Sequence, residues 1–163
     1  MKDDERRWIA ETVNDREGYR VEFAALEAPV TVDGMHDLAL FENLTFGRVL
    51  ILDGAVQVTT ADEFIYHEAM AHVPLFAHGD ARRVLIVGGG DGGIAREALR
   101  HGGIERVTLV EIDRAVVDLA VRLLPEITGG AFDDSRLDLV VDDGARFVET
   151  TGERFDVVIV DSP

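Results

Sequence analysis

The chain has 163 residues, of which 47% are hydrophobic, so it is long enough for one folded domain and a small additional unit. It contains no cysteine, which excludes disulfides, thiolate metal ligands and a cysteine nucleophile. Its formal net charge of −16 argues against nucleic acid as a partner and favours a cationic ligand, although an acidic surface kept for solubility is an alternative explanation.

Residues 1–61 show short strand-like runs between turns, and we expect a small antiparallel β-sheet unit. Strands are predicted over 20–26, 37–42, 49–52 and 55–60. Asp53-Gly54 separates the last two runs and is typical of a two-residue hairpin turn, because glycine accepts positive φ freely and aspartate nearly so.

Residues 62–163 change to a helical and then an alternating pattern. Apolar residues at three- and four-residue steps predict a helix after Asp62, a candidate N-cap, and Pro74 is expected to kink or shorten that helix. Predicted strands over 83–87, 106–111, 137–141 and 155–160 then alternate with predicted helices over 93–101, 114–124 and 144–150, the second of them closed by Pro125. This alternation indicates an α/β fold, a Rossmann-like parallel sheet wound with helices.

The sequence stops three residues after the fourth predicted parallel strand. A sheet that ends there has an exposed edge strand, which predicts either a truncated chain or a partner that covers the edge. The start of the sequence is charged and lacks the apolar segment of a secretion signal, and no apolar run has membrane-spanning length. We therefore expect a cytoplasmic protein without a membrane partner.

The strongest motif lies between the first predicted parallel strand and the helix after it. Gly88, Gly90 and Gly93 have the G-x-G-x-x-G spacing of a nucleotide-binding turn, and the second half of that signal, Glu111, follows about 20 positions later, where a carboxylate can bind ribose hydroxyls. Asp91 lies inside the loop and would repel a pyrophosphate. The loop therefore predicts a cationic ligand that contains a nucleoside. The alternative is a βα turn that binds no ligand.

Acidic residues follow every predicted parallel strand, and the carboxyl ends of such strands meet at one edge of the sheet. They are Asp91, Glu111, Asp113, Asp142, Asp143 and Asp161. Taken singly, each could be a helix N-cap, which fits Asp113 well. Taken together, they are expected to surround a cation, because crowded like charges are costly without one.

No metal site and no serine nucleophile are predicted. His67 and Glu68 begin a pattern that resembles a zinc helix, but the second histidine would have to be at position 71, which is alanine, rather than at His72. The G-x-S-x-G motif of serine hydrolases does not occur in the sequence.

Several segments together resemble the spermidine synthase family of aminopropyltransferases, which use the fold of S-adenosylmethionine-dependent methyltransferases. These segments are LDGAVQ at 52–57, DEFIYHE at 62–68, GGGDGG at 88–93, VEID at 110–113 and DVVIVDS at 156–162. The resemblance runs from about residue 20 to the end of the chain. It implies an N-terminal β-sheet domain over 1–61 and a donor-binding domain over 62–163 that is incomplete at its C-terminus.

The resemblance implies transfer of an aminopropyl group from decarboxylated S-adenosylmethionine to putrescine or a similar diamine, with no metal. Asp161 would be the catalytic acid–base residue, assisted by Tyr66. Asp91 would bind the amine of the donor, Glu111 its ribose, and Asp142 and Asp143 would lie beside its adenine. The remaining predicted donor-site residues are Gln57, His67, Gly88, Gly90 and Gly93.

Two departures from the family pattern stand out. His36 replaces a glutamine that usually helps to bind the donor, and the second acid expected after Asp161-Ser162 is missing because Pro163 ends the sequence. Two alternatives therefore stay open, a methyltransferase and a non-catalytic fragment or oligomerisation module. The resemblance also implies a homodimer or homotetramer formed through the N-terminal sheet.

Overall fold

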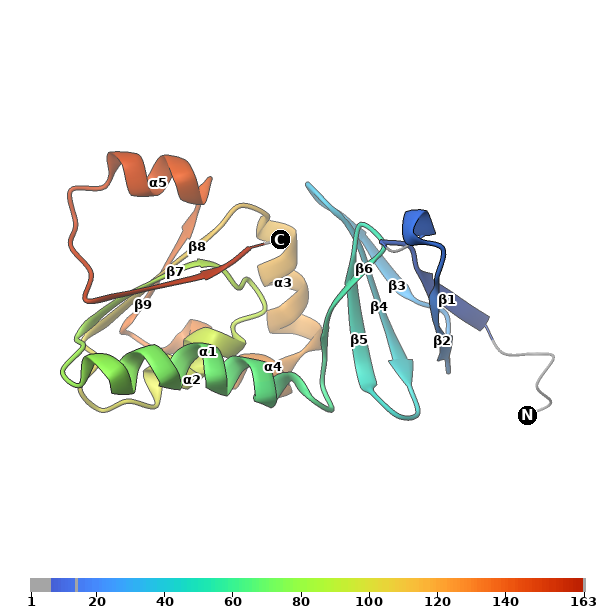
Figure 1. Ribbon diagram of the computed structural model, residues 1–163, viewed down its shortest axis with the longest axis horizontal. Helices are drawn as coiled ribbons and strands as arrows, with labels where there is room; N and C mark the ends of the chain where they lie inside the picture. The colour runs from blue at the N-terminus through green and yellow to red at the C-terminus, as the bar shows by residue number, and fades with distance from the viewer. Residues whose placement is uncertain (1–6, 14, 163) are drawn as a thin grey trace. The chain divides into compact units, whose positions relative to one another are not determined.

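The computed structural model describes residues 7–13 and 15–162. Most of the charged N-terminal segment (residues 1–6) and Pro163 lie outside the described residues. The chain divides into two compact units, the first ending at Glu63 and the second beginning at Phe64 (Figure 1). No helix in the described residues has both the length and the apolar character needed to cross a membrane.

The first unit consists of two antiparallel sheets, where the sequence predicted one. Its elements are β1 (Arg7–Glu11), the 3₁₀ helix η2 (Asp15–Glu17), β2 (Val21–Ala25), β3 (Val30–Asp33), β4 (Asp37–Asn43), β5 (Gly47–Leu52) and β6 (Ala55–Thr59). β1 and β2 form a two-stranded sheet, and the other four strands follow the order β3-β4-β5-β6. β1 and β3 were not predicted, because both are short, end on an acid and depend on their sheet partners for definition.

The predicted hairpin at Asp53-Gly54 is confirmed. Leu52 pairs with Ala55, so the connection has two residues, and φ is 48° at Asp53 and 79° at Gly54. Two successive positive φ values are typical of the turn whose twist matches that of its flanking strands. The Asp53 carboxylate also accepts a hydrogen bond from the Asp37 backbone N–H at 2.8 Å, which joins the turn to the start of β4.

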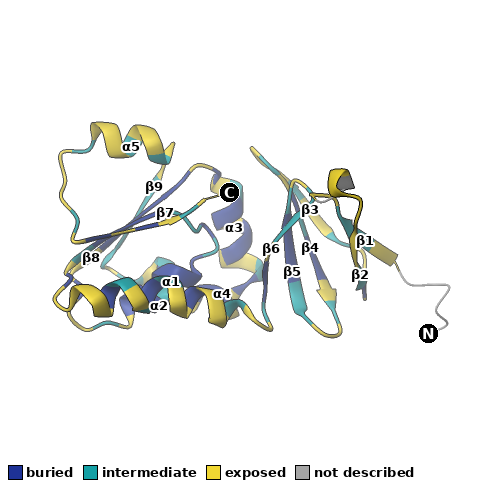
Figure 2. Ribbon diagram, in the orientation of Figure 1, coloured by how far each residue is buried: buried dark blue, intermediate teal, exposed yellow. Residues whose placement is uncertain are grey.

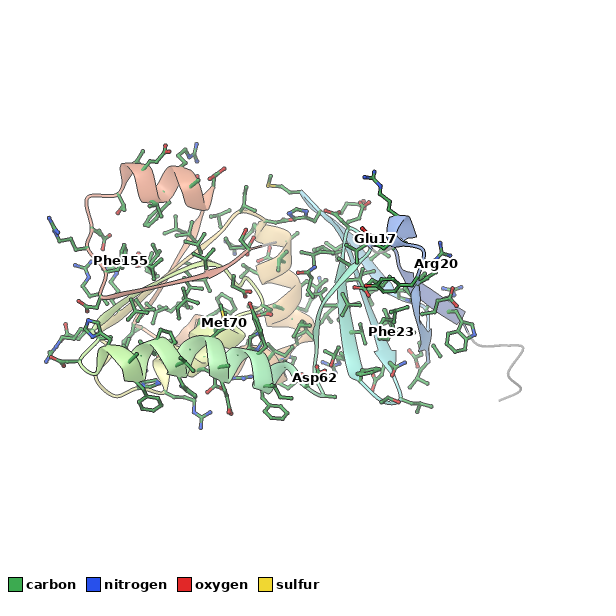
Figure 3. The ribbon with its side chains drawn as sticks, in the orientation of Figure 1. Glu17, Arg20, Phe23, Asp62, Met70 and Phe155 are labelled. Atoms are coloured by element: carbon green, nitrogen blue, oxygen red, sulfur yellow. The ribbon has the colours of Figure 1, made fainter. Side chains whose placement is uncertain are left out.

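Aromatic packing forms part of the core of the first unit. The Phe23 ring (labelled in Figure 3) lies 6.3 Å from the ring of Phe41 and 5.7 Å from that of Phe46, centroid to centroid. Phe41, Val49 and Ile51 are buried in one hydrophobic cluster, and Phe23 is partly buried against it. This unit therefore buries a core of its own.

The second unit is the predicted Rossmann-like α/β fold. Its elements are α1 (Glu63–His78), β7 (Arg83–Gly88), α2 (Gly93–Leu99), β8 (Arg106–Glu111), α3 (Arg114–Leu123), α4 (Pro125–Thr128), η3 (Ala131–Asp133), β9 (Leu137–Val141), α5 (Gly144–Thr150) and β10 (Val157–Asp161). The four strands are all parallel, in the order β10-β7-β8-β9. β10, the fourth parallel strand in sequence, therefore lies at an edge of the sheet.

Helices cover both faces of this sheet (Figure 1). On one face, Ala71 and Leu75 of α1 and Ile94 of α2 share a cluster with Ile86 and Leu109, and all five are buried. On the other face α5 begins against β7, where Gly144 leaves no room for a side chain beside Val87. Figure 2 shows the central strands β7 and β8 and parts of α1 and α2 as buried, whereas α5 is exposed or intermediate along its length.

The two predictions about proline have different outcomes. α1 continues through Pro74 to His78, so it is not shortened, since the proline removes a single backbone N–H while Ala71 and Leu75 are buried in the core. A kink at Pro74 stays a prediction. The prediction that the second helix ends before Pro125 is confirmed, since α3 ends at Leu123. Pro125 also occupies the first position of α4, which was not predicted, and its missing N–H costs no helical hydrogen bond there.

The last strand begins at Val157, two residues later than predicted. The Asp156 carboxylate accepts hydrogen bonds from the backbone N–H groups of Arg82 and Arg83, both at 2.8 Å. These bonds attach the end of the preceding loop to the start of β7. Phe155 (labelled in Figure 3) lies under the Arg83 guanidinium, 5.8 Å from its ring centroid. Because Phe155 and Asp156 make these contacts with the start of β7, they are not part of the strand to which their composition had assigned them.

Candidate active site at the carboxyl edge of the parallel sheet

The carboxyl ends of the four parallel strands are aligned, as the sequence predicted. In the strand register Asp161 pairs with Gly88, and Glu111 pairs with Val141. β7 leads directly into the glycine loop, β8 ends on Glu111 and β10 ends on Asp161. The loop glycine and these two acids are therefore brought to the same edge of the sheet.

Glu111 is a buried carboxylate held by backbone donors. Its two oxygens accept hydrogen bonds from Gly90 N–H at 3.1 Å and from Asp113 N–H at 2.9 Å. Burial raises the pKa of Glu111 above its ordinary value, and these backbone bonds oppose that rise. A side chain at position 90 would place its Cβ 2.7 Å from Oε2 of Glu111, so only glycine permits this contact.

Asp91 and His67 form a pair that the sequence did not predict. His67 is 1% exposed on α1, and its Nε2 lies 3.3 Å from Oδ2 of Asp91. The other oxygen of Asp91 accepts a hydrogen bond from Gly93 N–H at 2.8 Å. The His67 ring occupies the space in which a Cβ on Gly93 would stand, 2.1 Å from Nδ1. The start of α2 is thus packed directly against this histidine.

Tyr66 and Asp161 form the second pair. The Tyr66 hydroxyl donates to Oδ1 of Asp161 at 2.6 Å, across 95 positions of sequence. Burial raises the pKa of Asp161, as does the negative charge of Asp91, whereas the Tyr66 hydrogen bond and His67 lower it. Burial and the hydrogen bond to Asp161 raise the pKa of Tyr66 to about 12. The four side chains Tyr66, His67, Asp91 and Asp161 therefore form one electrostatically connected group.

Asp142 and Asp143 lie after β9, and both carboxylates interact with residues at the start of α5. Asp143 is the N-cap of α5 and accepts from Arg146 N–H at 3.0 Å. Asp142 forms an ion pair with the Arg146 guanidinium, and that hydrogen bond lowers the pKa of Asp142. Both residues follow the strand end as predicted, and the contacts described here are typical of the start of a helix.

Gln57, the remaining predicted residue, belongs to the first unit. It lies exposed on β6, and its side-chain amide donates to the Ala55 carbonyl at 3.3 Å. Its place in a donor site therefore stays a prediction that rests on the resemblance.

Asp113 is confirmed as a helix cap. Its carboxylate accepts a hydrogen bond from Ala115 N–H at 2.9 Å at the start of α3. Its backbone N–H meanwhile donates to Glu111, a function that residue identity cannot reveal because every residue except proline has this donor. Gly89 was likewise not singled out, although its N–H donates to the Asp161 carbonyl at 3.1 Å.

The two histidines of the rejected zinc pattern point to different partners. His67 faces Asp91, whereas His72 lies 2.9 Å from the ring nitrogen of His101 and 3.2 Å from Glu97. Among residues 7–13 and 15–162, no group of three or more histidine, aspartate and glutamate side chains has an arrangement able to hold a metal ion.

Two family models match the chain. The spermidine synthase tetramerisation domain matches residues 32–60, and the spermine/spermidine synthase domain matches residues 63–163. The boundary between the two matches lies close to the boundary between the two compact units.

Curated relatives are similar over most of this chain. The polyamine aminopropyltransferase 1 of Pseudomonas aeruginosa is 55% identical over 152 residues, which cover 93% of this chain and 53% of the relative. The polyamine aminopropyltransferase of Ruegeria sp. is 61% identical over 125 residues, which cover 77% of this chain and 44% of the relative. The chain thus spans about half the length of the curated relatives that it matches.

Solved structures agree with the fold. A spermidine synthase in complex with the transition-state analogue AdoDATO and the spermidine synthase of Thermotoga maritima each superpose with a TM-score of 0.87 at 37% identity. Each match covers 96% of this chain and 53% or 54% of the solved chain. By its two family models and its close relatives, the chain belongs to the spermine/spermidine synthase family.

Proposed function

We propose that this chain is the donor-binding part of a spermidine synthase-type aminopropyltransferase. It would use decarboxylated S-adenosylmethionine and putrescine and form spermidine and methylthioadenosine. The observation that supports this proposal most directly is the Tyr66–Asp161 hydrogen bond of 2.6 Å, next to the Asp91–His67 pair at the carboxyl edge of the sheet. The names of the curated relatives and of the similar structures point to the same reaction.

The acids suit a donor with two positive charges. Decarboxylated S-adenosylmethionine has a sulfonium and a primary ammonium but no carboxylate. Asp91 would therefore attract its ammonium, whereas Asp91 would repel the carboxylate of ordinary S-adenosylmethionine. Glu111 would accept hydrogen bonds from the ribose hydroxyls. We assign the remaining donor contacts to Gln57, His67, Asp142, Asp143 and the glycines 90 and 93, as the resemblance implies.

The reaction requires the protein to supply a base, but it does not require the protein to activate the leaving group. The sulfonium is already a good leaving group, whereas the attacking amine is protonated at neutral pH. The amine must lose one proton to the Asp161 carboxylate, positioned by the Tyr66 hydroxyl. Its freed nitrogen lone pair then forms a bond to the aminopropyl carbon, and the carbon–sulfur bond breaks with its electron pair left on methylthioadenosine.

No step of this reaction calls for a metal. The acceptor, putrescine or a similar diamine, follows from the family rather than from a described pocket. We also propose that the chain associates as a dimer or tetramer through the sheet β3–β6, because the family model over residues 32–60 is that of a tetramerisation domain. A cytoplasmic location stays a prediction.

Mass spectrometry tests the reaction directly. Spermidine should form from putrescine and the decarboxylated donor, and Asp161→Asn should reduce the rate by about 10²-fold or more, the range expected when a general base is lost. Asp138→Asn, in an exposed ion pair of β9 with Arg106, is the matched control and should leave the rate unchanged.

Calorimetry with this chain separates the alternatives. Methylthioadenosine should bind, and the decarboxylated donor should bind more tightly than S-adenosylmethionine. A preference for S-adenosylmethionine would favour a methyltransferase. Absence of methylthioadenosine binding would favour a non-catalytic module and contradict the proposal.

A further inference from the structure

The end of β10 is locked to the first glycine of the donor loop. Asp161 is the last residue of β10 and pairs with Gly88, the last residue of β7. The next loop residue continues this link, since Gly89 N–H donates to the Asp161 carbonyl at 3.1 Å. The backbone of Asp161 is therefore held by the glycine loop, while its side chain reaches Tyr66.

The fit at Gly88 excludes any side chain. A Cβ there would stand 1.8 Å from the Asp161 carbonyl oxygen and 2.7 Å from its carbon. Both are backbone atoms, so rotation of a side chain cannot relieve the overlap. Gly88 also has φ of +80°, which residues with a Cβ rarely adopt. A side chain at position 88 must therefore displace the end of β10.

Gly90, two residues later, contacts a different acid. A Cβ added at Gly90 would stand 2.7 Å from Oε2 and 2.8 Å from Cγ of Glu111, so the glycine makes room for this side chain. Gly90 N–H also donates to that carboxylate. Two glycines of one loop thus determine the positions of two different acids, one on β10 and one on β8.

We propose that Gly88 is a positioning residue for Asp161, so that the first glycine of the loop controls the acid–base residue rather than the donor. The role of Asp161 in this statement rests on the proposed function. The geometric claim is independent of it: substitution at position 88 should separate the Asp161 carboxylate from the Tyr66 hydroxyl and leave Glu111 in place. Gly88 was predicted from the sequence as a donor-binding residue, and its described contacts point to Asp161 instead.

The ionisation of Tyr66 measures this separation without any enzymatic assay. Burial, and after it the hydrogen bond to Asp161, raise its pKa to about 12. The chain has only two tyrosines, so Tyr19→Phe leaves Tyr66 as the sole phenol in an ultraviolet titration between pH 9 and 11. In this background Tyr66 should stay largely protonated, whereas Asp161→Asn should let it ionise within the range.

Gly88→Ala and Gly90→Ala form the matched pair. Gly88→Ala should lower the midpoint of the Tyr66 titration by about one pH unit or more, toward the ordinary tyrosine value, and change methylthioadenosine affinity by less than about three-fold. Gly90→Ala should leave the titration unchanged and weaken methylthioadenosine binding by about ten-fold or more, as expected when a buried hydrogen-bonded acid is displaced.

Circular dichroism at each pH confirms that the variants are folded. Should Gly88→Ala fail to fold, Gly89→Ala gives the second test, because its Cβ would lie 3.3 Å from Oδ2 of Asp161. An unchanged Tyr66 titration in the folded variant would overturn the proposal, as would an equal shift in Gly90→Ala. If the unmodified chain does not bind methylthioadenosine, the proposed function fails, yet the titration still decides whether Gly88 positions Asp161.

Discussion

Glu111 combines two opposing environments in one carboxyl group. It is 8% exposed, so water is largely removed from it, but two backbone N–H groups donate to its oxygens. Burial is the larger effect and raises its pKa. An acid of this kind can present a fixed acceptor pair to hydroxyl groups, because its oxygens are already oriented before a ligand arrives.

This raised pKa predicts a specific pH dependence of stability. The folded chain binds the Glu111 proton more tightly than the unfolded chain does. The contribution of this group to the free energy of unfolding is therefore fully present below the ordinary glutamate pKa of 4.5 and falls as pH rises through the raised value. Glu111→Gln removes the titration. The free energy of unfolding of the wild type minus that of the variant should therefore decrease from pH 4 to pH 7.

Urea unfolding at several pH values within that range measures the difference. Glu149→Gln, at an exposed position of α5, is the control for replacing a glutamate elsewhere in the same unit. Parallel stability curves for wild type and Glu111→Gln would contradict the prediction.

At the scale of elements, α3 depends on a local cap. Asp113→Ala should lower the free energy of unfolding by about 1 kcal/mol, because Ala115 N–H then loses its acceptor. The matched control on the same helix is Asp118→Ala, whose exposed ion pair with Arg114 should be worth about 0.5 kcal/mol or less. Urea unfolding of both variants checks the difference.

Asp113→Ala should also keep methylthioadenosine binding, since the backbone N–H that donates to Glu111 remains in the variant. If the free energy of methylthioadenosine binding decreases by more than the free energy of unfolding does, the Asp113 side chain itself supports the donor site. The element and the site would then be coupled more closely than their hydrogen bonds indicate.

At the scale of the whole molecule, the net charge of −16 should assist binding of cations. Raising the salt concentration from 0.1 M to 1 M shortens the screening length from about 10 Å to about 3 Å. The decarboxylated donor should therefore bind about three-fold or more weakly at high salt, whereas methylthioadenosine, which is uncharged at neutral pH, should bind almost equally. Calorimetry at the two salt concentrations compares them, and equal salt dependence would show that the negative field has no part in recognition.

The sequence by itself determined the features that depend on neighbours along the chain. The hairpin at Asp53-Gly54 and the Asp113 cap follow from the conformational and hydrogen-bonding properties of one or two residues. The alternation of strands and helices after residue 82 follows from apolar periodicity, and it sufficed to predict a parallel sheet with acids at its carboxyl edge.

Only the tertiary structure decided which side chains meet. Tyr66 and Asp161 are 95 positions apart, and their hydrogen bond exists because β10 crosses over to pair with β7 rather than extending the sheet beyond β9. The same pairing gives Gly88 its contact with Asp161, and the packing of α1 brings His67 to Asp91. Apolar periodicity carries no information on such contacts, because strand order and register are set by the burial of whole faces and not by any short segment. The association of Tyr66 with Asp161 was implied by the family resemblance alone.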